Sequence, residues 1–436
     1  MIAPLPTLML QISVILVTAR LVGLAFRRVH QPQVMGEMVA GILLGPSFLG
    51  WMAPGVSATL FPPESLGLLN TLAQIGLLLF MFLVGLELQP HLLRERGHAA
   101  LVISHASILA PFLLGSLLAL YIYPLLSDDS VTFPSFALFM GAAMSITAFP
   151  VLSRILAERK LLQTRLGTVA IACAAVDDIT GWCILAGVVL LVRSSGSSNL
   201  GWMVGGTAVY LLAMAFVVRR LMPRLSQFAE KRGGITEGAL SIALVFMLIS
   251  GAATESLGIH ALFGAFAVGV IMPKERGFVE GITDKIRDLT VVLLLPLFFV
   301  AVGLQTRIGL VQGASMWALT ALITIVAIAG KLGGSAIAAR LSGMGPRQSW
   351  SIGILMNTRG LMELVLLSIG LELGVLSPTL FTMLVLMALV TTFMTSPLLE
   401  LVYFRQFSLV RWIRARSSSS AKPPETPAID QNPAGT

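Results

Sequence analysis

Charged residues are scarce in this sequence. Asp, Glu, Lys and Arg make up 11% of the 436 residues, against 56% hydrophobic residues. A soluble globular domain carries about 25% charged residues. The shortage of charge therefore predicts a polytopic membrane protein, although the net charge of +8 could by itself suggest a nucleic-acid partner.

Cysteines and catalytic motifs are also scarce. Cys173 and Cys183 are the only cysteines, and on one helix they would stand roughly 15 Å apart. That is too far for a disulfide, so we expect both to be small core residues. The sequence has no metal-ligand spacing, no Ser/His/Asp constellation and no phosphate-binding loop. We therefore expect a protein that is not an enzyme and uses no cofactor.

Long apolar runs are abundant. A spanning helix needs about 20 mostly apolar residues, and thirteen runs qualify, centred near residues 16, 42, 77, 112, 145, 178, 211, 245, 265, 297, 326, 360 and 389. The first lies in MIAPLPTLMLQISVILVTARLV, which lacks the basic start of a cleaved signal. We predict an all-α polytopic membrane protein with thirteen transmembrane helices.

The basic residues predict the orientation of these helices. Nearly all of the 29 Lys and Arg residues fall in the loops of one side or near the C-terminus, and only Arg193 and Arg307 fall in the opposite loops. Basic loops stay in the cytoplasm. We expect an external N-terminus and a cytoplasmic C-terminus in a bacterial inner (plasma) membrane, and no nucleic-acid partner. The polar segment 404–436 is expected to be a disordered cytoplasmic tail.

Two pairs of segments repeat within the chain. GEMVAGILLGP at 36–46 resembles HALFGAFAVGVIMP at 260–273, and LLLFMFLVGLELQ at 77–89 resembles LLLPLFFVAVGLQ at 293–305. The pairs match the second predicted span with the ninth and the third with the tenth, and an offset of seven spans reverses orientation. The sequence therefore predicts two inverted six-helix repeats, which are typical of secondary transporters with a site near the midplane.

The repeat pairs the fifth span with the twelfth, and both are interrupted. In FALFMGAAMSITAFPVLSRIL, Pro150 cannot continue an unstrained helix, and Ser145 and Thr147 come just before it. Matching interruptions point to a binding site where broken helices meet. The second interruption lies in SIGILMNTRGLMELVLLSIG and consists of Asn357, Thr358, Arg359 and Gly360.

Five ionisable residues fall near the centres of predicted spans: Asp177, Asp178, Lys331, Arg359 and Glu363. Each costs roughly 3 kcal/mol or more there unless it is paired or hydrated. We expect Lys331 to pair with one aspartate, which leaves the other to bind a proton or a small cation in turn. Arg359 and Glu363, four residues apart, either neutralise each other or join the site. For the aspartates, a purely structural ion-pair cluster is the alternative.

Five stretches together resemble one transporter family. They are QPQVMGEMVAGILLGPSFLG, GLLLFMFLVGLELQP, SITAFPVLSRIL, the VDD stretch and MNTRGLMELVLLSIG, in this order. Over residues 7 to about 403 they resemble the monovalent cation:proton antiporter-2 family. The resemblance implies the sodium/proton antiporter fold, with crossed broken helices in a membrane domain of residues 1–403. The implied parts are dimerising scaffold helices at about 7–90 and 236–306, core helices at about 98–192 and 313–403 that move like an elevator, and a linker helix at about 199–222.

The resemblance also implies roles for individual residues. Asp178 matches the carboxylate that alternately binds the cation and a proton, Asp177 the partner of Lys331, and Thr147 the broken-helix residue closest to the ion. By analogy with this family, in which an aspartate pair tends to go with more than one proton per cation, the resemblance implies electrogenic exchange. We expect an antiporter that exchanges Na⁺ or K⁺ for H⁺ in pH homeostasis and forms a homodimer. The alternatives are a gated cation channel or leak pathway on the same fold, and a sodium-coupled symporter for an organic solute.

Overall fold

The structure is a computed structural model, and it describes residues 4–29, 31–87, 97–128, 131–162, 164–194, 200–223 and 235–404. All regular secondary structure in this part of the chain is helical, which confirms the all-α prediction. The tail predicted at 404–436 lies, beyond its first residue, outside the described residues.

The helices account for the predicted spans. In the described part, eleven helices are long and apolar enough to cross a membrane, and the bent pair α19 and α20 makes a twelfth. The eleven-residue α14 takes the place of the ninth predicted span. The first half contains α1 Pro4–Arg28, α2 Gln33–Leu44, α3 Leu49–Met52, α4 Pro54–Leu60, α5 Pro63–Glu87, α7 Gly97–Leu126, α8 Phe133–Ser145, α9 Phe149–Glu158 and α10 Arg165–Ser194. The rest contains α11 Leu200–Leu212, α13 Glu237–Ser256, α14 Ala261–Ile271, α15 Arg276–Asp288, α16 Leu295–Gln305, α17 Gly313–Ile328, α18 Gly334–Leu341, α19 Pro346–Met356, α20 Leu361–Glu372 and α21 Pro378–Leu399. Short turns link or extend some of them: η1 Ala213–Val218, η2 Leu289–Leu294, η3 Ile308–Leu310, η4 Ala329–Gly333 and η5 Glu400–Phe404.

Broken helices cross in the middle of the molecule. Extended backbone separates α8 from α9, and a four-residue break separates α19 from α20. The Ala148 N–H donates to the Thr358 carbonyl oxygen at 3.0 Å, so the two breaks touch. Pro150 lies in the first turn of α9, where its missing N–H would have had no helical partner. The break therefore comes before the proline, because the proline starts the second half of the span.

Two close helix crossings hold the neighbouring helices. α2 crosses α16 at Gly41 and Gly303, and α5 crosses α14 at Gly85 and Gly269. A β-carbon on Gly303 would stand 2.1 Å from the Gly41 carbonyl carbon, so only glycine allows this approach. Exchanging the two predicted repeats would turn one crossing into the other. The packing is the one that an inverted repeat would produce, and the repeat itself stays a prediction.

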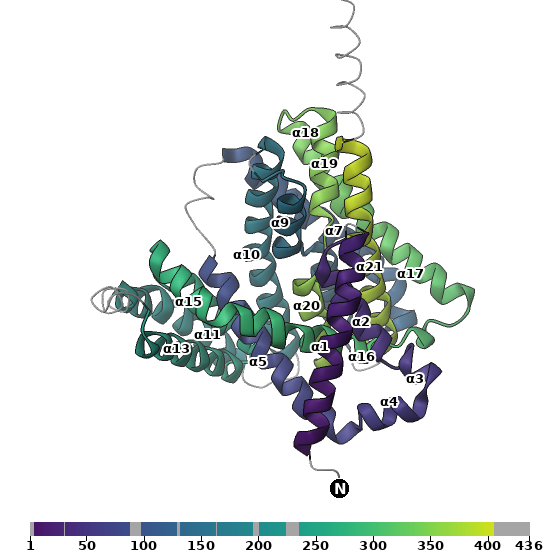
Figure 1. Cartoon of the computed structure of the whole chain (residues 1–436). Coiled ribbons are helices and arrows are strands. Elements are labelled where there is room, and N and C mark those ends of the chain that lie inside the picture. Colours follow the sequence, from purple (N-terminus) through teal and green to yellow (C-terminus); the bar gives the residue numbers. More distant parts are fainter. Residues whose placement is uncertain are drawn as a thin grey trace, which may run out of the picture.

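The broken helices occupy the centre. In Figure 1, α9, α10, α19 and α20 lie in the middle, with α13 and α15 on one flank and α17 on the other. We call the end of the bundle at which α1 begins the first face, and the end at which α1 stops the second face.

Cys173 is buried on α10 but Cys183 is exposed, so the expectation of two core cysteines was wrong for Cys183. Residues ten positions apart on a helix point in directions that differ by about 80°, so the two cysteines lie on different sides of α10.

Candidate ion-binding site

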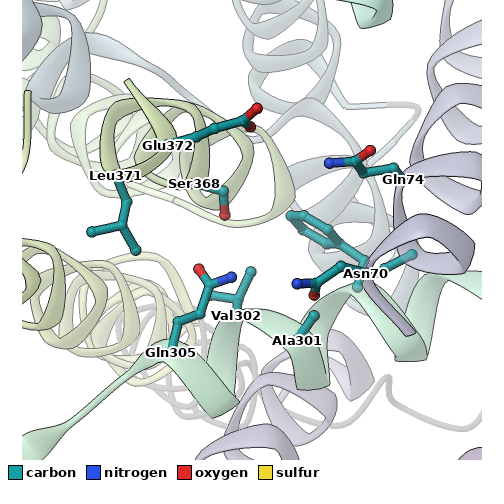
Figure 2. Close-up of a pocket in the computed structure, with 10 residues that line it drawn as sticks. Asn70, Gln74, Ala301, Val302, Gln305, Ser368, Leu371 and Glu372 are labelled. Carbon is teal, nitrogen blue, oxygen red and sulfur yellow. The ribbon is translucent and has the colours of Figure 1, made fainter. Parts of the chain in front are cut away.

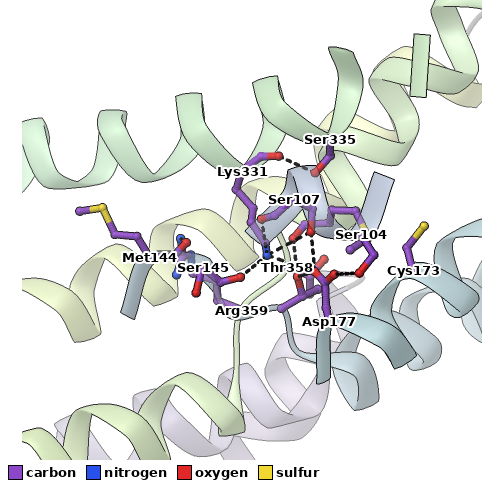
Figure 3. A network of polar contacts seen from close by, with 12 residues as sticks. Ser104, Ser107, Met144, Ser145, Cys173, Asp177, Lys331, Ser335, Thr358 and Arg359 are labelled. Carbon is purple, nitrogen blue, oxygen red and sulfur yellow. Dashed lines mark hydrogen bonds and ion pairs between the residues drawn. The ribbon is translucent and has the colours of Figure 1, made fainter. Parts of the chain in front are cut away.

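The Asp177 carboxylate on α10 accepts four hydrogen bonds. Ser104 Oγ donates to Oδ1 at 2.5 Å, and Ser107 Oγ donates to Oδ2 at 2.5 Å. Thr147 Oγ1 also donates to Oδ2 at 2.7 Å, and Lys331 Nζ donates to it at 3.2 Å (Figure 3). An ionised carboxylate is an acceptor only, and four donors converge on this one. The surroundings of Asp177 thus suit a fixed anion.

Lys331 lies in the π-helical turn η4, and its side chain is fully buried. Its ammonium group pairs with Asp177 at 3.2 Å and donates to the Ser107 carbonyl oxygen at 2.9 Å and to the Ser145 carbonyl oxygen. Single π-turns inside helices are frequent at functional sites. The expected pairing of Lys331 with one aspartate is therefore present, and the same cation binds the last carbonyl of α8.

Asp178 has very different surroundings from its neighbour. Its side chain is also buried, at 2% exposure. Its Oδ1 atom has no hydrogen-bond partner among the described residues. Buried polar atoms are nearly always paired, because leaving one unpaired costs free energy. Asp178 therefore carries an unused acceptor in the interior of the protein.

Arg359 joins the second break to the first. Its Nη1 and Nη2 atoms donate to the carbonyl oxygens of Ala143 and Met144, each at 2.8 Å. Nη1 also lies 3.0 Å from Glu363 Oε2, and both side chains are fully buried. The last carbonyls of a helix need partners and attract cations. Arg359 thus pairs with Glu363, as the first possibility raised by the sequence requires, and it also caps α8.

The remaining candidates line the two breaks. Thr358 Oγ1 donates to the Leu355 carbonyl oxygen at 2.6 Å, and Ser145 Oγ donates to the Ala142 carbonyl oxygen at 3.0 Å. The Asn357 Oδ1 atom is buried and, like Asp178 Oδ1, lacks a hydrogen-bond partner in the described part of the chain. Asn357 follows α19, which packs against α10. Glu363 Oε1, in the first turn of α20, is a further buried oxygen without such a partner among the described residues.

The charges of this cluster do not balance. Asp177, Asp178 and Glu363 carry three negative charges when ionised, and Lys331 and Arg359 carry two positive charges. All five side chains are buried. An uncompensated buried charge is strongly unfavourable. One proton or one monovalent cation would complete the balance, so the cluster is suited to hold either.

A cavity of about 540 Å³ leads from the second face toward the cluster. Phe149, Pro150 and Leu361, which begin the second halves of the broken helices, line it together with Arg154 and Arg287. A smaller cavity of about 310 Å³ lies at the first face between α5, α16 and α20. The site therefore lies between cavities at opposite ends of the bundle.

Sequence reasoning missed several residues of the site. Ser104 and Ser107 stand three residues apart on α7, within the run LVISHASILA, which is apolar apart from these serines and His105, and this spacing on one helical face is a usable signal. Thr392 on α21 binds the backbone of Arg359, accepting from its N–H at 2.9 Å and donating to its carbonyl oxygen at 2.8 Å. No local pattern marks Thr392, because it meets the break only in three dimensions.

The fold and the site together define a class of protein, a multi-pass membrane transporter with crossed broken helices around buried charges. Residues 13–401 match the family described as sodium/hydrogen exchanger, transmembrane. The chain belongs to this sodium/hydrogen exchanger family, whose members are transporters and not enzymes. This finding confirms the family resemblance of the sequence motifs.

Several curated relatives are similar over most of this chain. The Na⁺/H⁺ antiporter NhaS4 of Synechocystis sp. is 42% identical over 393 residues, covering 90% of this chain and 96% of the relative. The cation/H⁺ antiporter 17 of Arabidopsis thaliana is 43% identical over 401 residues, and the K⁺/H⁺ antiporter 1 of Saccharomyces cerevisiae is 32% identical over 415 residues. The chain spans about half the length of these two, 48% and 47%.

A solved structure has a similar fold. The sodium proton antiporter MjNhaP1 from Methanocaldococcus jannaschii matches with a TM-score of 0.61 at 17% identity, covering 90% of this chain and 96% of the other. At this identity the match supports the antiporter fold and no residue role.

Proposed function

We propose that this protein is a secondary active antiporter that exchanges Na⁺ or K⁺ for H⁺, with Asp178 as the shared site. The observation that carries the proposal is the buried Asp178 Oδ1 atom, which has no partner among the described residues and lies in a cluster with one excess negative charge when all five groups are ionised. The names of the relatives point the same way, since they include sodium, potassium and general cation antiporters. Both Na⁺ and K⁺ stay open as the cargo.

The two aspartates would have different roles in the exchange. Asp178 would bind a proton and a cation in turn, because each neutralises the excess charge and only one fits at a time. Asp177 would stay ionised while it accepts its four hydrogen bonds. We further propose electrogenic exchange. During the cycle the Asp177–Lys331 ion pair would break, and this pair of side chains would then carry a second proton.

The movement would follow the two predicted groups of helices. The core helices at about 98–192 and 313–403 would slide as an elevator against a dimerising scaffold at about 7–90 and 236–306. This motion would alternately connect Asp178 to the cavities at the two faces. By the distribution of basic residues, the first face is the outside of a bacterial-type inner membrane and the second face is the cytoplasm.

Proteoliposomes with a trapped pH dye test the proposal. Na⁺, K⁺ and Li⁺ are added one at a time, with the membrane potential clamped or free. Wild-type protein should move protons with at least one cation, and Asp178→Asn should reduce that movement to background. Asp128→Asn, which makes the same change at an exposed loop residue, is the matched control and should behave as wild type.

Three results would contradict parts of this proposal. Absence of proton movement with every cation would exclude the antiporter. Cation flux without proton flux would favour a channel. Normal exchange by Asp178→Asn would show that Asp178 is not the shared site.

A further inference from the structure

Several polar side chains line the cavity at the first face. It measures about 310 Å³ and lies between α5, α16 and α20. Figure 2 shows the amides of Asn70, Gln74 and Gln305, the hydroxyl of Ser368 and the carboxylate of Glu372 around it. Alanine, valine, leucine and phenylalanine side chains form the rest of its wall. Five oxygen-bearing side chains from three helices thus share one small space.

The chemistry of this lining suits a monovalent cation. Carboxylate, amide and hydroxyl oxygens are the ligands that hard cations prefer. Ser368 Oγ is buried and lacks a hydrogen-bond partner among the described residues. The described lining includes one acidic side chain, Glu372, and no basic one. By contrast, two arginines and one glutamate line the cavity at the second face, namely Arg154, Arg287 and Glu87.

Helix ends add to the negative potential of the cavity. α16 ends at Gln305 and α20 ends at Glu372, and both residues line it. The carboxyl end of a helix carries roughly half a negative charge. Two such ends and one carboxylate therefore face the same small volume.

The cavity also lies in line with the charged cluster. Glu372 and Ser368 stand on α20, which begins beside the second break and carries Glu363 in its first turn. Nine residues separate Glu363 from Glu372, a rise of about 14 Å along the helix. Phe298 lines the cavity at the first face, and the adjacent Phe299 lines the one at the second face. At this point α16 therefore stands between the two cavities.

We propose that the first-face cavity is a second cation site, which holds one partly hydrated alkali cation on its way to or from Asp178. Glu372 supplies the charge, and the amides of Asn70, Gln74 and Gln305 supply neutral oxygens. The site sets the affinity for the cation at the first face alone. This inference rests on the proposed antiport function.

Transport measured from each face tests the role of Glu372. In vesicles of defined orientation, Glu372→Gln should raise the apparent KM for the cation at the first face roughly tenfold, because the charged site no longer concentrates it. The maximal rate of uptake from the first face and the KM at the second face should stay unchanged. Glu64→Gln, an exposed carboxylate in the first turn of α5 outside this cavity, is the matched control. Equal KM values for the two variants, or a rise at both faces, would overturn the proposal.

A labelling experiment separates this inference from the antiport proposal, because it needs no transport. Gln74→Cys, in a Cys183→Ser background, is modified with a membrane-impermeant cationic methanethiosulfonate reagent. Na⁺ or K⁺, but not choline at the same ionic strength, should slow the modification, and Glu372→Gln should remove this protection. Protection without any proton exchange would support the cation site and exclude the antiporter. Exchange by the wild type without protection would exclude the cation site and leave the antiporter standing.

Discussion

Asp177 and Asp178 are neighbours in sequence, yet the structure gives them opposite surroundings. Asp177 accepts four hydrogen bonds, one of them from Lys331. Asp178 keeps an oxygen without a partner among the described residues. Successive helix positions point about 100° apart, so the Asp177 carboxylate reaches the serines of α7 and Lys331 and the Asp178 carboxylate points in another direction. At the scale of residues, this difference is what makes Asp178 the candidate for exchange.

The Lys331–Asp177 pair gives a prediction about coupled residues. Lys331→Gln leaves a buried aspartate without its cation, and breaking such a pair costs about 3–5 kcal/mol. The double variant Lys331→Gln with Asp177→Asn removes both charges and should lose less stability than the single variant. The proposed coupling also requires the pH profile of exchange to change in Lys331→Gln.

Thermal unfolding in detergent and proton flux as a function of pH measure these two effects. A double-mutant cycle reports the coupling energy directly. Strictly additive losses of stability, together with an unchanged pH profile, would show that the pair has no role in exchange.

At the scale of elements, the ends of broken helices decide the architecture of the site. The last three residues of α8, Ala143, Met144 and Ser145, offer carbonyl oxygens that no helical N–H can reach. Arg359 and Lys331 bind all three. The cations therefore stabilise the break as well as balancing buried carboxylates. This double use explains why cations lie so deep in an apolar bundle.

The glycine crossings give a prediction at the same scale. Gly303→Val would place side-chain atoms against the backbone of α2, because even a β-carbon added at Gly303 would stand 2.1 Å from the Gly41 carbonyl carbon. Overpacking of this kind costs about 3 kcal/mol or more. Gly205→Ala on α11, where a β-carbon would meet no atom within 4 Å, is the control.

Thermal unfolding and the yield of folded protein after detergent extraction measure this effect. Gly303→Val should unfold at a clearly lower temperature, and Gly205→Ala should match the wild type. Equal stability of the two variants would mean that α2 and α16 do not cross as closely as described.

At the scale of the whole molecule, one lysine joins two helices at the second face. Lys274 Nζ donates to the carbonyl oxygens of Gly85 and Leu86 on α5 at 2.8 and 2.9 Å, and of Gly269 on α14 at 2.9 Å. Lys274 follows α14 in a loop outside the spanning helices. Burial lowers the pKa of its ammonium group to about 8, because desolvation penalises the charged form.

This lowered pKa predicts how stability changes with pH. In the unfolded chain the lysine keeps its ordinary pKa of about 10.4. Between pH 8 and pH 10 the unfolded state therefore binds more protons, so Lys274 makes the free energy of unfolding rise with pH. The difference in Tm between wild type and Lys274→Met should grow across this window. The control is Lys285→Met, at an exposed lysine of α15, and its difference from wild type should stay constant. A constant difference for Lys274→Met as well would contradict the buried environment of this lysine.

Composition and pattern alone determined much of this protein. Apolar runs fixed the membrane class and the spans, because a bilayer admits only helices of about 20 residues or closed barrels. The rarity of charge inside those runs singled out the five ionisable residues of the cluster, since a charge inside the membrane is unfavourable unless it is paired or hydrated. Pro150 and the segment 357–360, which consists of three polar residues and a glycine, located both interruptions to within a few residues.

The tertiary structure decided which of these residues are used together. Lys331 binds Asp177 and not Asp178, Arg359 caps α8, and Ser104, Ser107 and Thr392 join the site from helices distant in sequence. The first-face cavity likewise combines side chains from α5, α16 and α20. No local pattern encodes these choices, because the direction of a side chain across a helix crossing depends on how two distant segments pack. The sequence determined that charges lie in the membrane, and only the packing of the broken helices decided which of these charges pair with one another.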